Sequence, residues 1–221
     1  MKHYLKLIRP EQYVKNLFVL APLFFSGTLS NYCALTQVLW AAISFSLAAS
    51  SIYIVNDFFD IQADQAHPTK SKRPLASGKI EIKKALLLQL ILMVGALFLA
   101  YLVNAQLLMI ISGYIALNFL YSKWLKHIAI VDLNIIAIGF VLRIMAGSAA
   151  SNVEPSIWIL IITYLLALFL AISKRRTDVV LAQDGREVRK SIEGYNLNFI
   201  DSVMGILASI IIICYIFYCI D

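Results

Sequence analysis

The residues best suited to chemistry are three aspartates that directly follow an apolar segment. Asp57, Asp60 and Asp64 are spaced three and then four residues apart, and Asn56 precedes them. On a helix this spacing places all three carboxylates on one face. Like charges so close together repel one another unless a cation lies between them, and Mg²⁺ is bound through oxygen ligands of this kind. The spacing predicts a divalent-metal site, with a solvated acidic loop as the alternative.

Positive residues follow the acidic cluster closely in the chain. Lys72 and Arg73 come just after Asp64, and further lysines stand at Lys79 and at 83–84. Carboxylates that hold a metal, with cations beside them, suit a diphosphate, because the metal bridges phosphate oxygens and the cations neutralise the remaining charge. We expect Lys72 and Arg73 to belong to such a site. For the later lysines we favour contact with anionic lipid heads.

A second charged segment begins with Lys174, Arg175 and Arg176 and continues through Arg189 to Tyr195. Its excess of cations predicts an anion-binding surface. A basic segment here is also what membrane orientation alone requires, so both interpretations stay open.

Arg143 differs from the other cations because it lies well inside an apolar segment. An ionisable group within a membrane is costly and normally faces a cavity or a partner. We interpret Arg143 as lining a cavity, with a structural hydrogen bond between helices as the alternative. Asp132 lies on the same side of that helix, but eleven residues rise about 16 Å. Tyr121 and Lys126 end the preceding apolar segment, where Tyr121 also fits an interfacial aromatic belt.

The composition defines the elements that must position these residues. Of the 221 residues, 61% are hydrophobic and 14% are charged, whereas soluble domains average about 45–50% and about 25%. The sequence therefore predicts an all-α, polytopic transmembrane bundle. Its seven expected spans are 15–32, 37–55, 83–103, 105–121, 129–149, 156–173 and 198–220. We expect one domain, 1–221, with two long polar loops at 56–82 and 174–197.

The basic residues are distributed unevenly between the connections. Eighteen of the 19 Lys and Arg lie before the first expected span or after the second, fourth and sixth, and Arg143 is the exception. By the positive-inside rule the amino terminus and both long loops face the cytoplasm of a multi-pass inner-membrane protein. The formal charge of +6 is explained by this distribution and does not indicate a nucleic-acid partner.

Several other catalytic arrangements are missing from the sequence. The three cysteines and three histidines have no zinc-ligand spacing, and neither a phosphate-binding glycine loop nor a nucleophile elbow is present. We therefore expect chemistry that depends on a metal and on charge, with a diphosphate leaving group stabilised by Mg²⁺.

The run from Asn56 to Asp64, followed by Arg73-Pro74 and Ser77-Gly78, resembles the first signature of the UbiA-type intramembrane prenyltransferase superfamily. These helical bundles hold a diphosphate through Mg²⁺ above a lipid-filled cavity. Within the superfamily the sequence is similar to the decaprenyl-phosphate phosphoribosyltransferase branch. The similar stretches are 7–25, 56–78, 121–126, 139–143 and 173–176.

The second loop departs from the pattern of the aromatic prenyltransferases, which have another Asp-x-x-x-Asp there. Asp178 has Ala182 four residues later, and the basic run 174–176 precedes it. The resemblance therefore implies an enzyme that transfers 5-phosphoribose from phosphoribosyl diphosphate to a polyprenyl phosphate. An aromatic prenyltransferase with a prenyl diphosphate donor is the alternative from the same superfamily. A non-enzymatic anion or metal transporter is the alternative from another class.

The resemblance also implies roles for individual residues. The metal ligands are Asp57, Asp60 and Asp64, the first two being catalytic. The substrate-binding residues are Lys15, Asn56, Lys72, Arg73, Tyr121, Lys126, Arg143, Lys174, Arg175, Arg176, Arg189 and Tyr195. The superfamily usually has nine spans, so the expected seven lack the last two and with them a wall of the lipid groove. A homo-oligomer is left open.

Overall fold

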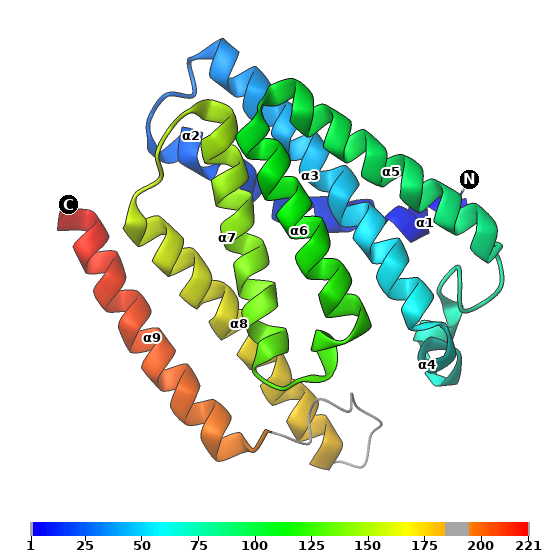
Figure 1. Cartoon of the computed structure of the whole chain (residues 1–221). Coiled ribbons are helices and arrows are strands. Elements are labelled where there is room, and N and C mark those ends of the chain that lie inside the picture. Colours follow the sequence, from blue (N-terminus) through cyan, green and yellow to red (C-terminus); the bar gives the residue numbers. More distant parts are fainter. Residues whose placement is uncertain (1, 184–194, 221) are drawn as a thin grey trace. The chain divides into compact units, whose positions relative to one another are not determined.

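The computed structural model describes residues 2–183 and 195–220, and every regular element in these ranges is helical (Figure 1). The α-helices are α1 (Lys2–Ile8), α2 (Ala21–Phe25), α3 (Tyr32–Phe59), α4 (Ile61–Ala66), α5 (Ile82–Val103), α6 (Ala105–Lys123), α7 (Val131–Ser151), α8 (Ile157–Gln183) and α9 (Leu197–Ile220). Three 3₁₀ helices accompany them: η1 (Pro10–Leu20), η2 (Lys70–Lys72) and η3 (Leu125–His127). This confirms the all-α prediction.

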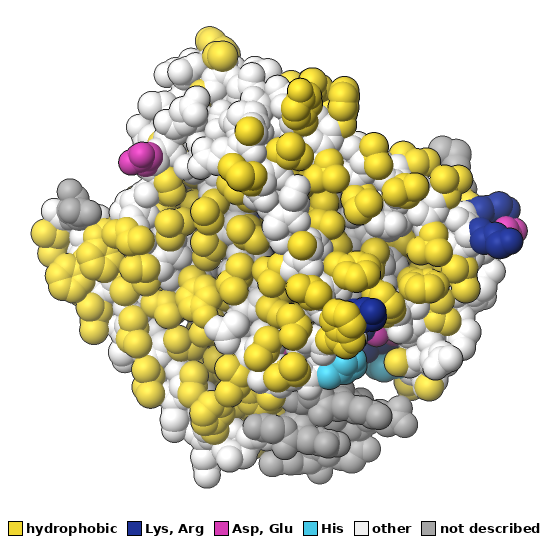
Figure 2. All heavy atoms as spheres, viewed as in Figure 1, with side chains coloured by type: hydrophobic (Ala, Val, Ile, Leu, Met, Phe, Trp, Pro, Cys, Tyr) yellow, Lys and Arg dark blue, Asp and Glu magenta, His cyan; other side chains and the backbone are white. Residues whose placement is uncertain are grey.

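Six of these helices are long and apolar enough to cross a membrane: α3 and α5 to α9. They correspond to the last six expected spans. Their apolar residues are not confined to one stripe, and Figure 2 shows hydrophobic side chains over most of the visible face. Large side chains such as Leu87, Ile91 and Phe98 on α5 are more than half exposed. Exposed apolar side chains are expected on a helix surface that faces lipid, because lipid chains, unlike water, are themselves apolar.

The first expected span, 15–32, is not one long α-helix. Its residues are divided between η1 and the five-residue α2, after which the chain turns at Gly27 with φ +69°. Side chains three residues apart eclipse on a 3₁₀ helix, and Tyr13, Asn16 and Val19 form one such row. Tyr13 and Asn16, the two polar members of this row, form hydrogen bonds to α3. These tertiary contacts favour a 3₁₀ helix over an α-helix in η1.

Both long polar loops contain more helix than we expected. α3 continues through Asn56 and Asp57 to Phe59, and α4 follows almost immediately, so two of the three aspartates lie on helices. Likewise α8 continues past residue 173 to Gln183. An ion pair between Arg175 and Asp178, one turn apart, contributes to this extension, because opposite charges three residues apart stabilise a helix.

The described residues divide into two compact units, with α7 shared between them. The first unit comprises the residues up to Lys123 together with Arg143–Glu154. Within it α3 packs on α5 and α6, and η1 lies along α3. A cluster of buried side chains closes one end of α3 against α1 and the start of α5. Its members are Leu7, Ile54, Leu75, Ile80 and Ala85.

The second unit comprises Trp124–Leu142 and the described residues from Pro155 on. Its main contact is the hairpin of α8 and α9, which lie side by side in Figure 1. Buried Leu133, Ile172, Val179, Tyr195 and Ile200 form the core of this unit. Trp158 stacks on Phe217 at a ring-centroid distance of 5.3 Å and joins the far ends of the same two helices.

Candidate active site

Asp57 is the centre of the charged site in the first unit. It lies near the end of α3 and is only 2% exposed. Arg9 Nη2 donates to Asp57 Oδ1 at 2.5 Å, and Arg73 Nη1 donates to the same oxygen at 3.3 Å. A buried carboxylate is stable only with such partners. The first of the three predicted aspartates is therefore held between two guanidinium groups.

Arg73 also joins Asp57 to the last aspartate of the cluster. Its Nη1 donates to Asp64 Oδ2 at 2.7 Å, and Asp64 is as buried as Asp57. Asp60 is the residue at which α3 ends, and Asn56 Nδ2 donates to its Oδ2 at 3.0 Å. The structure therefore brings Asp57 and Asp64 together on one cation, while Asp60 forms a pair with Asn56.

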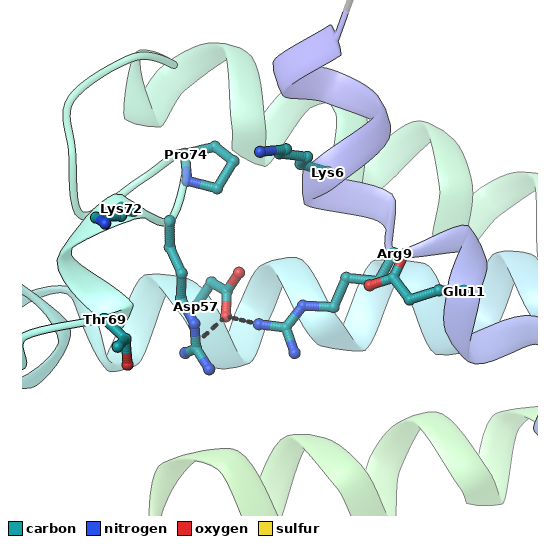
Figure 3. A pocket seen from close by; sticks show the side chains of 8 residues that line it. Lys6, Arg9, Glu11, Asp57, Thr69, Lys72 and Pro74 are labelled. Carbon is teal, nitrogen blue, oxygen red and sulfur yellow. Dashed lines mark hydrogen bonds and ion pairs between the residues drawn. The ribbon is translucent and has the colours of Figure 1, made fainter.

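A pocket of about 440 Å³ opens beside Asp57 (Figure 3). Its lining comes from α1, the start of η1, α3 and the segment around η2. The lining residues are Lys6, Arg9, Glu11, Asp57, Thr69, Lys72, Arg73 and Pro74. In Figure 3 the Arg9 side chain reaches Asp57 from the side of Glu11, and Thr69 and Lys72 lie on the opposite side. Four of the eight side chains are cations and only Pro74 is apolar, so the pocket suits a polar anion.

The chemistry of the donor set fits a divalent cation. Asp57 and Asp64 each place a carboxylate oxygen within hydrogen-bond distance of one positively charged nitrogen of Arg73. Oxygen ligands from carboxylates are what Mg²⁺ binds, together with water and substrate phosphate. In the described ranges no group of three His, Cys, Asp or Glu side chains is gathered closely enough to hold a metal unaided. Asp57 and Asp64, with Asp60 beside them, are the residues that could hold Mg²⁺ with phosphate oxygens as further ligands.

Sequence reasoning missed three charged residues of this pocket: Lys6, Arg9 and Glu11. They lie about fifty residues before Asp57 in the chain. The available signal was Arg9-Pro10, because a residue before proline leaves the helical conformation and ends a helix. Arg9 has φ +53° and ψ +60°, a left-handed conformation that is uncommon for a residue other than glycine. This bend between α1 and η1 carries its side chain to Asp57.

Arg143 is tied to a helix partner in the first unit. It is 5% exposed, and its Nε donates to Asn16 Oδ1 at 2.9 Å. The guanidinium carbon lies 4.7 Å from the centroid of the Phe45 ring and 5.5 Å from that of Tyr114. These contacts support the structural hydrogen bond that we gave as the alternative to a cavity-lining role. Asp132, on the same helix, bonds to Arg175 instead.

The second unit buries two of the expected substrate-binding residues, Arg175 and Tyr195. Arg175 is 3% exposed and forms ion pairs with Asp132 and Asp178. The backbone N–H of Ile130 donates to the Tyr195 hydroxyl at 2.6 Å, and that hydroxyl donates to Asp132 Oδ1 at 3.4 Å. Burial raises the pKa of the Tyr195 hydroxyl, which therefore stays protonated. These contacts join the start of α7 to α8 and to the residues before α9.

The other expected site residues are placed as follows. Lys15 is exposed on η1, Tyr121 is half-buried near the end of α6, and Lys126 is half-buried on η3. Lys174 is exposed on α8, and Arg176 pairs across the α8–α9 hairpin with Asp201 at 2.6 Å. Arg189 lies outside the described residues. Lys15 and Tyr121, which belong to the same unit as the pocket beside Asp57, do not line it.

Comparison with known proteins identifies the family to which this helical fold belongs. The model of the UbiA prenyltransferase family matches residues 17–220. The chain therefore belongs to the UbiA prenyltransferase family. Its membership and its six apolar helices make it an integral membrane protein.

Similar curated proteins include decaprenyl-phosphate phosphoribosyltransferases. The protein of that name from Mycolicibacterium smegmatis is 38% identical over 96% of this chain and 68% of its own length. The one from Mycobacterium tuberculosis is 36% identical over 95% of this chain and 71% of its own length. The chain thus spans about two thirds of the length of these relatives.

Solved structures share the fold. A UbiA homolog from Archaeoglobus fulgidus, bound to GPP and Mg²⁺, superposes with a TM-score of 0.81 at 20% identity. The superposition covers 97% of this chain and 77% of that one. At this identity the likeness establishes the fold, and the chemistry must be argued from the residues of this chain.

Proposed function

We propose that this protein is a Mg²⁺-dependent membrane enzyme that transfers 5-phosphoribose from phosphoribosyl diphosphate to a polyprenyl phosphate. The observation that carries the proposal is the lining of the pocket beside Asp57. Four cations, two acids and Thr69 surround about 440 Å³, with Pro74 as the one apolar member. The names of the mycobacterial relatives support the same activity.

The charge of the pocket favours a sugar diphosphate over a prenyl diphosphate. Phosphoribosyl diphosphate carries a diphosphate at one end of the ribose and a phosphate at the other, so it needs cations at two places. Lys6 and Arg9 lie on α1 and next to it, and Lys72 and Arg73 lie in the segment around η2. A prenyl diphosphate would instead need an apolar wall for its chain next to the diphosphate, and Pro74 is the one apolar residue in this lining.

In this proposal the aspartates and arginines exchange partners when the donor binds. Asp57 and Asp64, with Asp60, would hold Mg²⁺, and Arg73 and Arg9 would then be able to donate to phosphate oxygens of the donor. Bidentate guanidinium groups suit phosphate well. Asn56 orients Asp60 through the bond it already makes. Bound Mg²⁺ supplies stabilisation for the negative charge that develops on the leaving diphosphate.

The transfer itself needs no strong base. An oxygen of the polyprenyl phosphate, already an anion, attacks C1 of the ribose. The bond between C1 and the diphosphate oxygen breaks, and the diphosphate leaves with the electron pair of that bond. Arg9, Arg73 and Lys72 lie where they can neutralise that charge. No proton has to move in the step, and among the described residues those that line the pocket include no histidine.

The acceptor phosphate is assigned to the other expected cations. Lys15, Lys126 and Lys174 are candidates because they are cations of the basic segments that we assign to one side of the membrane, and Tyr121, near the end of α6, lies five residues before Lys126. Arg176 and Arg189 would add positive charge on the second basic segment. We assign these groups and the amino terminus to the cytoplasmic side of the inner membrane, since 18 of the 19 Lys and Arg follow that pattern.

A turnover assay with purified protein tests the proposal. Labelled phosphoribosyl diphosphate and a polyprenyl phosphate in detergent with Mg²⁺ should yield a lipid-linked phosphoribose and free diphosphate. Chelation of Mg²⁺ should abolish the product. Full turnover by an Asp57→Ala, Asp60→Ala double variant would refute the metal assignment.

A further inference from the structure

The 3₁₀ helix η1 is fastened to α3 by polar contacts at matched spacings. The hydroxyls of Tyr13 and Ser50 are bonded at 2.9 Å, and Asn16 Nδ2 donates to Ser46 Oγ at 2.8 Å. The η1 partners are three residues apart and the α3 partners are four apart. One turn of a 3₁₀ helix therefore matches one turn of an α-helix, with the chains running in opposite directions. Such pairing fixes the position of η1 along α3.

The C-terminal half of α7 also contacts η1. Arg143 Nε donates to Asn16 Oδ1 at 2.9 Å, so Asn16 is bonded to α3 and α7 at once. One turn later a Cβ on Gly147 would lie 1.8 Å from the backbone oxygen of Val19. Only glycine permits this approach of α7 to the η1 backbone. Arg143 and Gly147 thus contact η1 at positions three residues apart.

The other end of η1 carries Arg9 into the active-site pocket. Ser50 Oγ, already bonded to Tyr13, donates to the carbonyl oxygen of Ile8 at 2.7 Å, which fixes the peptide just before Arg9. Arg9 is held in its left-handed conformation there, and its guanidinium lies 5.2 Å from the centroid of the Tyr53 ring. Its conformation is thus determined by η1 and α3 together.

We propose that Arg143 is a positioning residue that sets the place of Arg9 at Asp57 through Asn16 and η1. The line of contacts runs from Arg143 to Asn16, along η1 to Arg9, and from there to Asp57 Oδ1. A guanidinium is needed because its Nε bonds Asn16 while its central carbon lies over the rings of Phe45 and Tyr114. The inference rests on the proposed function only in naming the donor whose binding Arg9 assists.

The competing role for Arg143 is direct contact with the acceptor phosphate. The structure opposes it, because Arg143 is only 5% exposed and its Nε is bonded to Asn16. The two roles predict different kinetic effects. A positioning residue changes the KM for phosphoribosyl diphosphate through Arg9, whereas a residue that binds the acceptor changes the KM for polyprenyl phosphate and does so independently of Arg9.

A double-mutant cycle between Arg143→Lys and Arg9→Lys distinguishes these roles. Arg143→Lys keeps the charge but loses the Nε bond to Asn16. It should raise the KM for phosphoribosyl diphosphate roughly three- to tenfold, the effect of one lost hydrogen bond. In the Arg9→Lys background the same change should have almost no further effect on this KM. Additive effects, or a change confined to the KM for polyprenyl phosphate, would overturn the inference.

If Arg143→Lys does not fold, two single substitutions on α3 test the same inference. Ser46→Ala removes the α3 partner of Asn16, and Ser44→Ala removes a buried bond from α3 to the Ala96 carbonyl on α5. Ser46 also donates to the Ala42 carbonyl within α3, so Ser46→Ala loses two hydrogen bonds of α3 and Ser44→Ala loses one, but only Ser46 is connected to η1. Ser46→Ala should raise the donor KM and Ser44→Ala should not, at similar thermal stability. Equal effects of the two would reject the inference, and an inactive wild type would reject the proposed function instead.

Discussion

Arg9 Nη2 lies 2.5 Å from Asp57 Oδ1, although the two residues are separated by 48 positions in the chain. The contact joins the turn after α1 to the end of α3 and closes one side of the pocket. Arg73 approaches the same oxygen from the segment after η2. The carboxylate thus receives two positive charges, which explains how it is tolerated at 2% exposure.

Asp57→Asn removes the charge at this centre without changing its shape. Arg9 and Arg73 then face a neutral amide, and one of the proposed Mg²⁺ ligands is lost. We expect turnover to fall by at least about 100-fold. The measurement is the initial rate of lipid-linked phosphoribose formation. Glu81→Gln is the control, because Glu81 pairs with Lys84 on the exposed surface and should keep the wild-type rate.

Arg73→Lys tests the bridge between two aspartates. One guanidinium nitrogen now contacts both Asp57 and Asp64, and a lysine is a point charge without the planar fork. We expect the Mg²⁺ concentration for half-maximal activity to change and the donor KM to rise by roughly tenfold, since each charge-assisted bond contributes about 1.5–3 kcal/mol. An unchanged donor KM would contradict the assignment of Arg73 to the diphosphate.

Gly147→Ala tests the close packing of α7 on η1. The new Cβ would lie 1.8 Å from the carbonyl oxygen of Val19. Because that atom belongs to the backbone, we expect a loss of about 1–3 kcal/mol in the free energy of unfolding. Thermal melting in detergent measures it. Gly113→Ala on α6 is the matched control, since open space surrounds that position and alanine there should stabilise by about 0.5–1 kcal/mol.

The buried cluster of the second unit makes a separate prediction for stability. Asp132→Ala leaves the buried guanidinium of Arg175 without its main carboxylate. We expect a loss of about 3–5 kcal/mol, because an uncompensated buried charge is left behind. Asp201→Ala breaks the exposed pair with Arg176 and should cost at most about 1 kcal/mol. Chemical unfolding of the two variants measures the difference, and equal losses would contradict the role given to Asp132.

The Tyr195 hydroxyl adds a pH dependence to the same cluster. Burial raises the pKa of this group, so the folded protein holds its proton more tightly than the unfolded chain does. Its contribution is therefore complete below the unfolded pKa of about 10 and is lost as the pH rises through the folded value. The difference in unfolding free energy between wild type and Tyr195→Phe should shrink above about pH 10. A difference that grows there would contradict the direction of the shift.

The sequence predicted those features that depend on neighbouring residues. Asp57, Asp64 and Arg73 lie within seventeen positions, so their type and spacing indicated a common site. Six apolar segments were long enough to be identified by length alone. The all-α architecture followed from them.

The features that were missed depend on tertiary contacts. Lys6 and Arg9 reach the pocket only because the buried residue Leu7 packs α1 against α3. The region 15–32 was predicted to be a membrane span because its apolar stretch is long enough. In η1, however, the residues that bond to α3 recur every three positions, as in a 3₁₀ helix. Arg175 was predicted to bind an anion, and its bond to Asp132, 43 positions away, was not predicted.

Direct competition for the purified protein tests the central claim, which is the identity of the donor. Calorimetric titration with phosphoribosyl diphosphate and Mg²⁺ should give saturable binding that Asp57→Asn abolishes. Geranyl diphosphate at the same concentration should compete weakly, because four of the eight residues that line the pocket beside Asp57 are cations and one is apolar. Tight, Asp57-dependent binding of geranyl diphosphate together with no binding of phosphoribosyl diphosphate would contradict the account.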